Sequence, residues 1–470
     1  MNSLRVSTLA LTMACAAGPV LSETVFTVTS AEDAGTGSLR AALNAASLAD
    51  GDSQIVVLTD GPIQISEGLK YDGVGRLSLL GAGQTIRTTE DVTLLSSTNG
   101  GSLHIGNLTF EGPGNYSINA RGDLDGVSGK GLFIDVRDDQ TGVVMLELDN
   151  VTVRGVSNHG VHVSDCSLAD DCGGGSGGAG EGSPASIHVR MANSTIEMVG
   201  QGKFDADGLR VDERSEGDIV FVSTNSVFTG VGADGVELDE GQAGDVIVRV
   251  SGGRFDANGD YCDPAILAAF MPEQDEGEFE QGQMMEDAIP GPISGSPDDM
   301  CFEREVDTYD DGSVEEYEFA IDVDDGFDVD EAGPGSIKAT VIGAAISNNF
   351  DEGLDFDEED AGDIHLTLIG TTAVGNTDDA YKNSEEGEGG VTGVMFNVAA
   401  TDNGGVGIVF EEEDGGDVTV IGSNVSTSGN DDGETGLEVV QDDDGTGALT
   451  LQASSIGDGQ EIEGVEMAVK

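Results

Sequence analysis

The chain has 470 residues, with 90 acidic against 19 basic residues, 72 glycines and no tryptophan, and its formal net charge is −71. Nucleic-acid binding is excluded for so negative a chain, because contact with DNA or RNA depends on Lys and Arg neutralising phosphate. The hydrophobic residues, 37% of the total, fall in regular short runs, which excludes a wholly disordered chain.

The N-terminus has the features of a secretory signal peptide over residues 1–22. A basic start and an apolar stretch of small residues end at Ser22, which offers a cleavage point before Glu23. The alternative is a lipoprotein acylated at Cys15. The lipobox before such a cysteine usually has a small or β-branched residue where this chain has Met13. No later segment approaches the roughly 20 consecutive apolar residues of a spanning helix. We therefore expect a mature protein that is secreted, periplasmic or at the cell surface, without a transmembrane segment.

A strand and a short helix are predicted directly after the signal peptide. Residues 26–29 alternate between apolar and polar side chains, and residues 37–43 read Gly-Ser-Leu-Arg-Ala-Ala-Leu. Ser38 is positioned to cap the N-terminus of that helix. Residues 23–50 are expected to form an N-terminal cap.

The phrase Gly-Asp-Ile/Val recurs along the chain at a fixed interval. Where no insertion intervenes, its copies are 27 residues apart; they start at Gly217, Gly244, Gly362 and Gly416, with looser copies at Gly335 and Gly389. A fixed period of this length is the signature of a repeat architecture.

Each repeat contains two alternating strands, a shorter apolar segment and an Asn-containing turn. The first strand reads Gly-apolar-x-apolar-acid-acid, as in residues 235–240 and 353–358, and the second follows the Gly-Asp step, as in residues 364–368. Asn tolerates the left-handed conformation expected at such corners, which fall at Asn258, Asn348, Asn349, Asn376, Asn403 and Asn430. Three short strands per 27 residues predict one turn of a coil whose strands stack about 4.8 Å apart.

These motifs resemble those of right-handed parallel β-helix proteins of the pectate-lyase-like superfamily. The resemblance rests on the Gly-Ser-Leu-Arg opening with its cap helix and on the repeated Asn-x-x-Asp/Glu-Gly corners, and it covers nearly the whole mature chain, residues 23–470. It implies an all-β fold class, a right-handed single-stranded parallel β-helix with an N-terminal cap helix that covers the first rung, a rung being one turn of the coil. It implies a fold and does not specify a substrate.

Two insertions interrupt the period. Residues 165–184 form a Gly-rich loop, and residues 259–325 form a longer, acidic and proline-containing loop or lid. Function in such coils usually lies where loops overhang a strand face. Four cysteines remain after cleavage, and in an oxidising compartment an even count favours disulfides. Three connectivities are open, of which we expect the local pairing of Cys166 with Cys172 and of Cys262 with Cys301.

Aligning the repeats on their glycines places acidic side chains in outward columns. At about 4.8 Å and an effective dielectric of about 20, adjacent unit charges repel by about 3.5 kcal/mol, so the columns need salt, raised pKa values or a hard cation such as Ca²⁺. The alternative is a solvated acidic face that binds nothing specifically. One column reads His162, Arg210, Glu237, Asp328, Asp355, Lys382 and Val409, and the next reads Ser164, Asp212, Asp239, Asp330, Asp357, Ser384 and Glu411. The predicted calcium ligands are Glu237, Asp239, Asp328, Asp330, Asp355 and Asp357.

Three consecutive repeats between the insertions also hold candidate catalytic residues, namely His162, Asp207, Arg210, Asp212 and Asp234. Paired carboxylates beside a histidine suit the hydrolysis of a glycosidic bond by general acid and base. Ca²⁺ with Arg210 as the base suits the lyase chemistry that the resemblance implies. The chain departs from familiar patterns, because residues 158–160 match the Gly-His-Gly of polygalacturonases only in part and no Arg/Lys cluster is present to hold an anionic sugar. Lys382 is expected to neutralise Asp355.

The sequence therefore predicts a secreted, acidic, calcium-binding β-helix that acts as a surface or matrix protein, without catalysis, and contacts extracellular polysaccharide or another cell-surface polymer. The alternative is a polysaccharide lyase or glycoside hydrolase with its site on the strand face near Arg210. A third interpretation, the passenger of an autotransported adhesin, is disfavoured because no membrane barrel follows the last repeat.

Overall fold

The computed structural model describes residues 23–118, 128–166, 182–259, 276–285, 288–289, 303–309, 312–320, 324–359, 361–442 and 445–469. The predicted signal peptide lies outside the described residues, as do Cys172, Cys262 and Cys301. Cleavage at Ser22 and the pairing of the cysteines therefore stay predictions.

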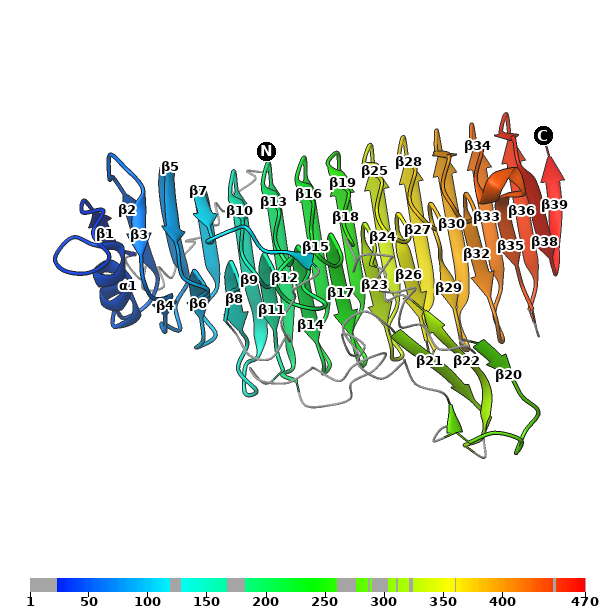
Figure 1. Cartoon of the computed structure of the whole chain (residues 1–470), viewed down its shortest axis with the longest axis horizontal. Helices are drawn as coiled ribbons and strands as arrows, with labels where there is room; N and C mark the ends of the chain where they lie inside the picture. The colour runs from blue at the N-terminus through cyan, green and yellow to red at the C-terminus, as the bar shows by residue number, and fades with distance from the viewer. Residues whose placement is uncertain are drawn as a thin grey trace, which may run out of the picture.

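The chain is a right-handed parallel β-helix, as predicted. Its strands stack in three parallel ladders that run the length of the molecule from the blue N-terminal end to the red C-terminal end of Figure 1. The first ladder is the 12-stranded sheet of β4 (Leu69–Tyr71), β6 (Leu95–Ser97), β8 (Leu132–Asp135), β11 (Val161–Ser164), β14 (Leu209–Glu213), β17 (Val236–Glu240), β23 (Asp328–Glu331), β26 (Asp355–Glu358), β29 (Ser384–Glu385), β32 (Val409–Glu412), β35 (Thr435–Val440) and β38 (Gly459–Glu463).

The other two ladders are hydrogen-bonded parts of one larger sheet. The second ladder, of longer strands, comprises β1 (Thr24–Val28), β2 (Ser53–Val57), β5 (Leu77–Thr88), β7 (Leu103–Glu111), β9 (Gly142–Asp149), β12 (Ala185–Ala192), β15 (Ile219–Thr224), β18 (Val246–Ser251), β24 (Ile337–Ile342), β27 (Asp363–Ile369), β30 (Gly390–Phe396), β33 (Val418–Ser423), β36 (Gly447–Gln452) and β39 (Val465–Val469). The third ladder consists of short strands. It begins at β3 (Ile63–Ile65) and passes through the second halves of β5 and β7. It continues with β10 (Thr152–Arg154), β13 (Thr195–Glu197), β16 (Val227–Thr229), β19 (Arg254–Asp256), β25 (Ala345–Ser347), β28 (Thr372–Val374), β31 (Ala399–Thr401), β34 (Ser426–Ser428) and β37 (Ser455–Ile456).

A helix closes the N-terminal end of the coil. In α1 (Leu39–Ser47) the hydroxyl of Ser38 accepts a hydrogen bond from the backbone N–H of Ala41 at 3.2 Å, which confirms the predicted cap. Leu39 and Leu43 are buried against the first strands. Among the described residues, no helix has the length and apolar character needed to cross a membrane.

From β14 to β32 the register keeps the 27-residue period except at the second insertion. Arg210 pairs with Glu237 and Asp328 with Asp355, but Glu237 pairs with Asp328, 91 residues ahead. This stacking favours a glycine at the corner before a first-ladder strand. At Gly235, for example, a Cβ would lie 2.4 Å from the carbonyl oxygen of Gly326 on the next rung. The coil is filled by apolar side chains, among them a run of stacked and edge-on phenylalanines through Phe255 and Phe327.

The second insertion is not an irregular loop throughout, because it contains an antiparallel sheet. Within the predicted loop of residues 259–325, β20 (Glu276–Glu278) and β21 (Glu303–Thr308) pair with opposite edges of β22 (Val314–Ala320). Val314 and Tyr317 form a small core for it. Figure 1 shows this sheet projecting from the side of the coil below β29.

The role predicted for the Asn corners needs correction. Asn348 has a φ of 55°, but Asn258, Asn349, Asn376, Asn403 and Asn430 are absent from the residues with positive φ. They form a buried amide ladder instead: the side chain of Asn258 donates to Asn349 at 3.0 Å, and the ladder continues rung by rung to Asn430. Left-handed asparagines occupy another corner, as at Asn225 and Asn424.

A second buried ladder consists of carboxyl groups. Six glutamates at the ends of first-ladder strands are fully buried and pair in register on successive rungs; they are Glu213, Glu240, Glu331, Glu358, Glu385 and Glu412. The alternation that turns Val211 inward also turns these side chains inward. The backbone N–H of Gly244, for example, donates to Glu240 at 3.1 Å.

Candidate functional site

The outward columns of the first ladder lie where the repeat predicted them. Register pairs His162 with Arg210, Arg210 with Glu237, Glu237 with Asp328 and Asp328 with Asp355, and a parallel column runs from Ser164 through Asp212 and Asp239 to Asp330, Asp357 and Ser384. These side chains point away from the coil interior, yet most are buried: Asp212 is 1% exposed and Asp239 5% exposed. The face is therefore not a solvated acidic surface at this point.

The N-terminal half of the face gathers the predicted catalytic residues around His162. Its Nε2 lies 2.6 Å from an oxygen of Asp212, and its Nδ1 contacts Nζ of Lys130. Lys130 is itself buried, with Nζ 4.8 Å from the centre of the Phe133 ring. The arrangement forms a chain from ammonium to imidazole to carboxylate, all withdrawn from water.

Two arginines tie this half to the next rung. Arg210 donates to Asp212 at 2.7 Å and to Glu237 at 2.5 Å. Arg214, 2% exposed, donates from both terminal nitrogens to the two oxygens of Asp239. Asp239 is thus the least available of the six predicted calcium ligands.

Burial and charge set the protonation of the first half. Burial lowers the pKa of Lys130 to about 8 against the opposing pull of Asp212, and burial lowers the pKa of His162 to about 3. Burial also opposes ionisation of Asp212, but Arg210 and His162 outweigh it and hold that pKa well below its usual range. The neighbouring carboxylates of Glu237 and others keep the pKa of Arg210 well above its usual value. Arg210 therefore stays charged, while Lys130, with a pKa of about 8, and Asp239, whose pKa burial raises to about 7, titrate near neutrality.

Asp207 and Asp234 belong to the turn that precedes the strand. The backbone N–H of Asp234 donates to Asp207 at 3.2 Å, and that of Asp325 donates to Asp234 at 2.5 Å. The second oxygen of Asp207 lies 3.1 Å from Nδ1 of His159. Burial raises the pKa of both carboxyl groups. Each thus bridges successive turns through one oxygen, and Asp207 also borders the histidines.

The C-terminal half of the face is almost purely acidic. Carboxylate oxygens of Glu237, Asp328 and Asp330 lie within 4.8 Å of one another, and so do those of Asp325, Glu352 and Asp355. Among the described residues no Lys or Arg pairs with Asp328 or Asp330 within 4.0 Å.

Lys382 closes this acidic stretch. Its Nζ donates to Asp355 at 2.9 Å and lies 3.5 Å from Asp357, which confirms the predicted neutralisation of Asp355. Asp355 and Asp357 thus share a cation of the protein itself, whereas Asp328 and Asp330 have none among the described residues.

Crowding of buried carboxyl groups raises their pKa values. Burial, with Asp355 adding repulsion, raises the pKa of Asp330 to about 6, and burial with Asp355 raises that of Glu352 to about 7. Burial and Asp330 raise the pKa of Asp328 well above its usual value. Each shift reports that ionising the cluster is costly without a compensating positive charge.

The donor set of this half fits a hard divalent cation. Glu237, Asp328 and Asp330 offer carboxylate oxygens, which Ca²⁺ prefers, at about 2.3 to 2.6 Å. Glu237 also accepts a hydrogen bond from Arg210. Two ligand oxygens of one Ca²⁺ ion lie at most about 5 Å apart, and the oxygens of Glu237, Asp328 and Asp330 lie within 4.8 Å of one another. These three residues would hold the ion on neighbouring strands β17 and β23.

Several residues of this face were not among the sequence-predicted site residues. Lys130 and Arg214 fall outside the aligned columns, Lys130 before the strand and Arg214 after it. Asp325 and Glu352 precede the corner glycines and enter the face from the turn. The available signal was the rarity of Lys and Arg in so acidic a chain, which makes each basic residue near the columns notable.

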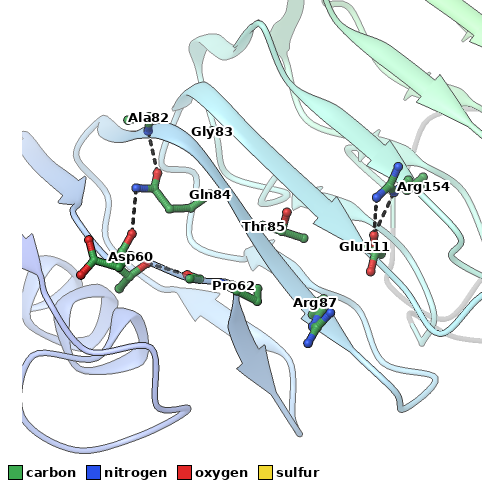
Figure 2. Close-up of a pocket in the computed structure, with 11 residues that line it drawn as sticks. Asp60, Pro62, Ala82, Gly83, Gln84, Thr85, Arg87, Glu111 and Arg154 are labelled. Atoms are coloured by element: carbon green, nitrogen blue, oxygen red, sulfur yellow. Dashed lines mark hydrogen bonds and ion pairs between the residues drawn. The ribbon is translucent and has the colours of Figure 1, made fainter.

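A separate pocket lies on the N-terminal rungs. It has a volume of about 480 Å³ and is lined by residues of β5, β7 and β10, including Gln84, Arg87 and Arg154. Figure 2 shows Arg154 paired with Glu111 at its rim, with Arg87 on the neighbouring strand. None of the sequence-predicted site residues lines it.

Comparison with known proteins gives only distant structural likenesses. No family model matches the sequence, and no curated protein matches it. The chain superposes on the enzymatically active domain of tailspike protein 2 of bacteriophage CBA120 with a TM-score of 0.43 and 9% identity, over 90% of this chain and 48% of that one. It thus spans about half the length of the tailspike chains it matches.

Two further solved structures align with this chain over a larger share of their own length. The A-module of the mannuronan C-5 epimerase AlgE4 of Azotobacter vinelandii has a TM-score of 0.37 and 13% identity, over 94% of this chain and 95% of that one. Pectate lyase Pel9A has a TM-score of 0.38 and 12% identity, over 94% and 79%. Likenesses this distant say nothing about what the present chain does, and the fold assignment rests on its own strand register.

Proposed function

We propose that this protein is an extracellular β-helix that binds Ca²⁺ on the outward face of its first ladder and contacts an acidic polysaccharide through the bound ion. The observation that carries the proposal is the group of Glu237, Asp328 and Asp330, whose carboxylate oxygens converge without a Lys or Arg partner for the two aspartates among the described residues. Oxygen ligands at this spacing are the kind that Ca²⁺ uses.

A bound Ca²⁺ ion would also offset the repulsion between this acidic chain and an acidic polymer. With a net charge of −71 the protein repels a polyuronate, and its few basic side chains at this face are engaged: Arg210, Arg214 and Lys382 all pair with carboxylates. A divalent ion on Asp328 and Asp330 would neutralise their two negative charges and leave coordination positions for a sugar carboxylate.

The test is retention of the protein on polyuronate gels with Ca²⁺ and with EDTA. We expect retention only with Ca²⁺, and its loss in an Asp328→Asn/Asp330→Asn variant. That variant should melt at a higher temperature than wild type in EDTA, because the substitutions remove repulsion, yet gain no stability from Ca²⁺. Asp50→Asn/Asp149→Asn, on exposed positions, is the matched control and should behave as wild type. Equal retention of wild type in EDTA would overturn the proposal.

A second function, polysaccharide lyase, is favoured by the buried chain of Lys130, His162 and Asp212. In such a reaction a base removes the proton beside a uronate carboxylate, and the bond to the leaving glycosidic oxygen breaks with its electron pair. Lys130, with a pKa of about 8, suits the role of base better than Arg210, which its carboxylate neighbours keep protonated.

Incubation with a panel of uronic-acid polysaccharides separates the two functions. A lyase would release unsaturated ends at a rate that rises as the pH passes through about 8, and Lys130→Met would abolish the release. Lys70→Met, an exposed position on β4, is the control. Calcium-dependent retention without any cleavage of the panel would leave the binding function and eliminate the lyase.

A further inference from the structure

One broad face of this acidic coil carries no acidic side chain. Three outward columns run across seven strands of the second ladder, β15, β18, β24, β27, β30, β33 and β36, in register with Lys338, Thr340 and Ile342. Asp and Glu make up 90 of the 470 residues, yet none occupies these columns. Acidic residues return only where the strands begin, as at Asp363 and at Asp245, which pairs with Lys338.

The same face exposes an apolar cluster. Ile342, Ile369 and Phe396 stack in one column, and Val394 and Ile421 stack in the next. Phe396, the last residue of β30, is 49% exposed, and Ile421, in the middle of β33, is 50% exposed. A contiguous apolar patch of this kind on a soluble protein marks a contact surface.

The dimensions of the face match a stable protein interface. Seven strands about 4.8 Å apart and about six residues long give roughly 34 Å by 20 Å, or close to 700 Å². A standard interface buries about 800 Å² on each partner. Figure 1 shows the strands from β18 to β36 lying side by side along the coil.

We propose that this acid-free face is the contact between two copies of the chain, which form a symmetric homodimer. Two copies with a net charge of −71 repel each other least where their acidic side chains are absent. A two-fold axis brings this same patch of both copies together. Val394, Phe396 and Ile421 form the centre, and the threonines and serines around them form the rim.

An interface of this kind strengthens with salt. Salt screens the repulsion between the acidic remainders of the two copies, whose range falls from about 10 Å at 0.1 M to about 3 Å at 1 M, while apolar contacts persist. A polyanion bound to the face through Arg249 would show the opposite dependence, because salt weakens such binding.

The experiment is sedimentation equilibrium of the full mature chain over a dilution series at 0.1 M and 1 M NaCl. We expect twice the monomer mass at 1 M NaCl, with a dissociation constant at least tenfold lower than at 0.1 M. Phe396→Glu and, separately, Ile421→Glu should raise that constant by about 100-fold, because a charge would be buried without a partner. Val74→Glu, at an exposed apolar residue outside the face, adds the same charge and should leave it unchanged.

Two results would overturn the proposal. One is a wild-type chain that stays monomeric at about 100 μM in 1 M NaCl, whatever the variants do. The other is a dimer that persists in both glutamate variants while their circular dichroism shows an intact fold. Because the wild-type measurement stands by itself, a variant that fails to fold does not rescue the inference.

Discussion

Arg214 and Asp239 form the most completely buried arginine–carboxylate pair of the site. Both terminal nitrogens of the guanidinium contact the carboxylate, and neither side chain is more than 8% exposed. Removing two charges from water is costly, and the cost is offset only while both partners are present. The pair therefore links neighbouring rungs at the boundary between the basic and the acidic halves of the face.

Replacement of Arg214 by methionine should destabilise the fold by roughly 3 to 5 kcal/mol, because it leaves Asp239 buried with only Arg210 at 3.4 Å. The measurement is the free energy of unfolding in urea. Arg249→Met, at an exposed arginine without an ion pair among the described residues, should change it by less than about 0.5 kcal/mol. Similar losses in the two variants would contradict the structural role of the pair.

At the scale of the strand, the glutamate ladder shows how a repeat buries an acid. Neighbouring carboxyl groups hydrogen-bond each other, with Asp165 beside Glu213 at one end and Gln441 donating to Glu412 at the other. Burial, together with repulsion from neighbouring carboxylates, raises the pKa of Glu213 to about 10 and that of Glu385 to about 9. The ladder is stable because some of its members stay protonated.

This ladder makes stability depend on pH in a defined direction. Since the folded-state pKa is above the unfolded value of about 4.5, the contribution is fully present below about pH 4.5 and is lost as the pH rises through about 9 to 10. We expect the melting temperature in 1 M NaCl to fall as the pH rises from about 4.5 to about 10. In Glu385→Gln the fall should be shallower, whereas the exposed Glu466→Gln should follow wild type. A slope that Glu385→Gln leaves unchanged would rule out the shared-proton account.

The strand scale also separates what the sequence predicts from what it does not. Alternation and the alignment of the repeats on their glycines predict that Arg210, Glu237 and Asp328 lie in one outward column, and the structure confirms that order. The same alternation turns Glu213 inward, but a lone buried carboxylate is so unfavourable that only the stacked partners and backbone donors make it acceptable.

The repeat pattern does not predict side-chain contacts between residues that are far apart in the chain. Lys130 meets His162 from outside the repeat, and the asparagines at the corners pair with one another instead of adopting the left-handed conformation. Both depend on side-chain geometry across rungs, which a period does not encode.

At the scale of the molecule, the charge is divided between faces. The first ladder carries the acidic columns, while the outward columns of the second ladder from β15 to β36 carry none. The repulsion within a chain of net charge −71 opposes the compact state and is screened by salt.

We therefore expect the melting temperature to rise between 0.1 M and 1 M NaCl even in EDTA, and to level off once the Debye length falls to about 3 Å. The check is a thermal melt of wild type at a series of NaCl concentrations, followed by circular dichroism at fixed pH. A melting temperature that falls with NaCl would mean that attractive ion pairs outweigh the repulsion across the molecule.

The most direct test of the account is a calorimetric titration of the mature protein with Ca²⁺ in 1 M NaCl, where screening by salt alone is already complete. The account predicts saturable binding with a small whole number of ions per chain, an increase in melting temperature that follows saturation, and the loss of at least one ion in Asp328→Asn/Asp330→Asn. Weak, non-saturating heats that match those of added NaCl would contradict it, and the acidic face would then be a screened surface without a cation site.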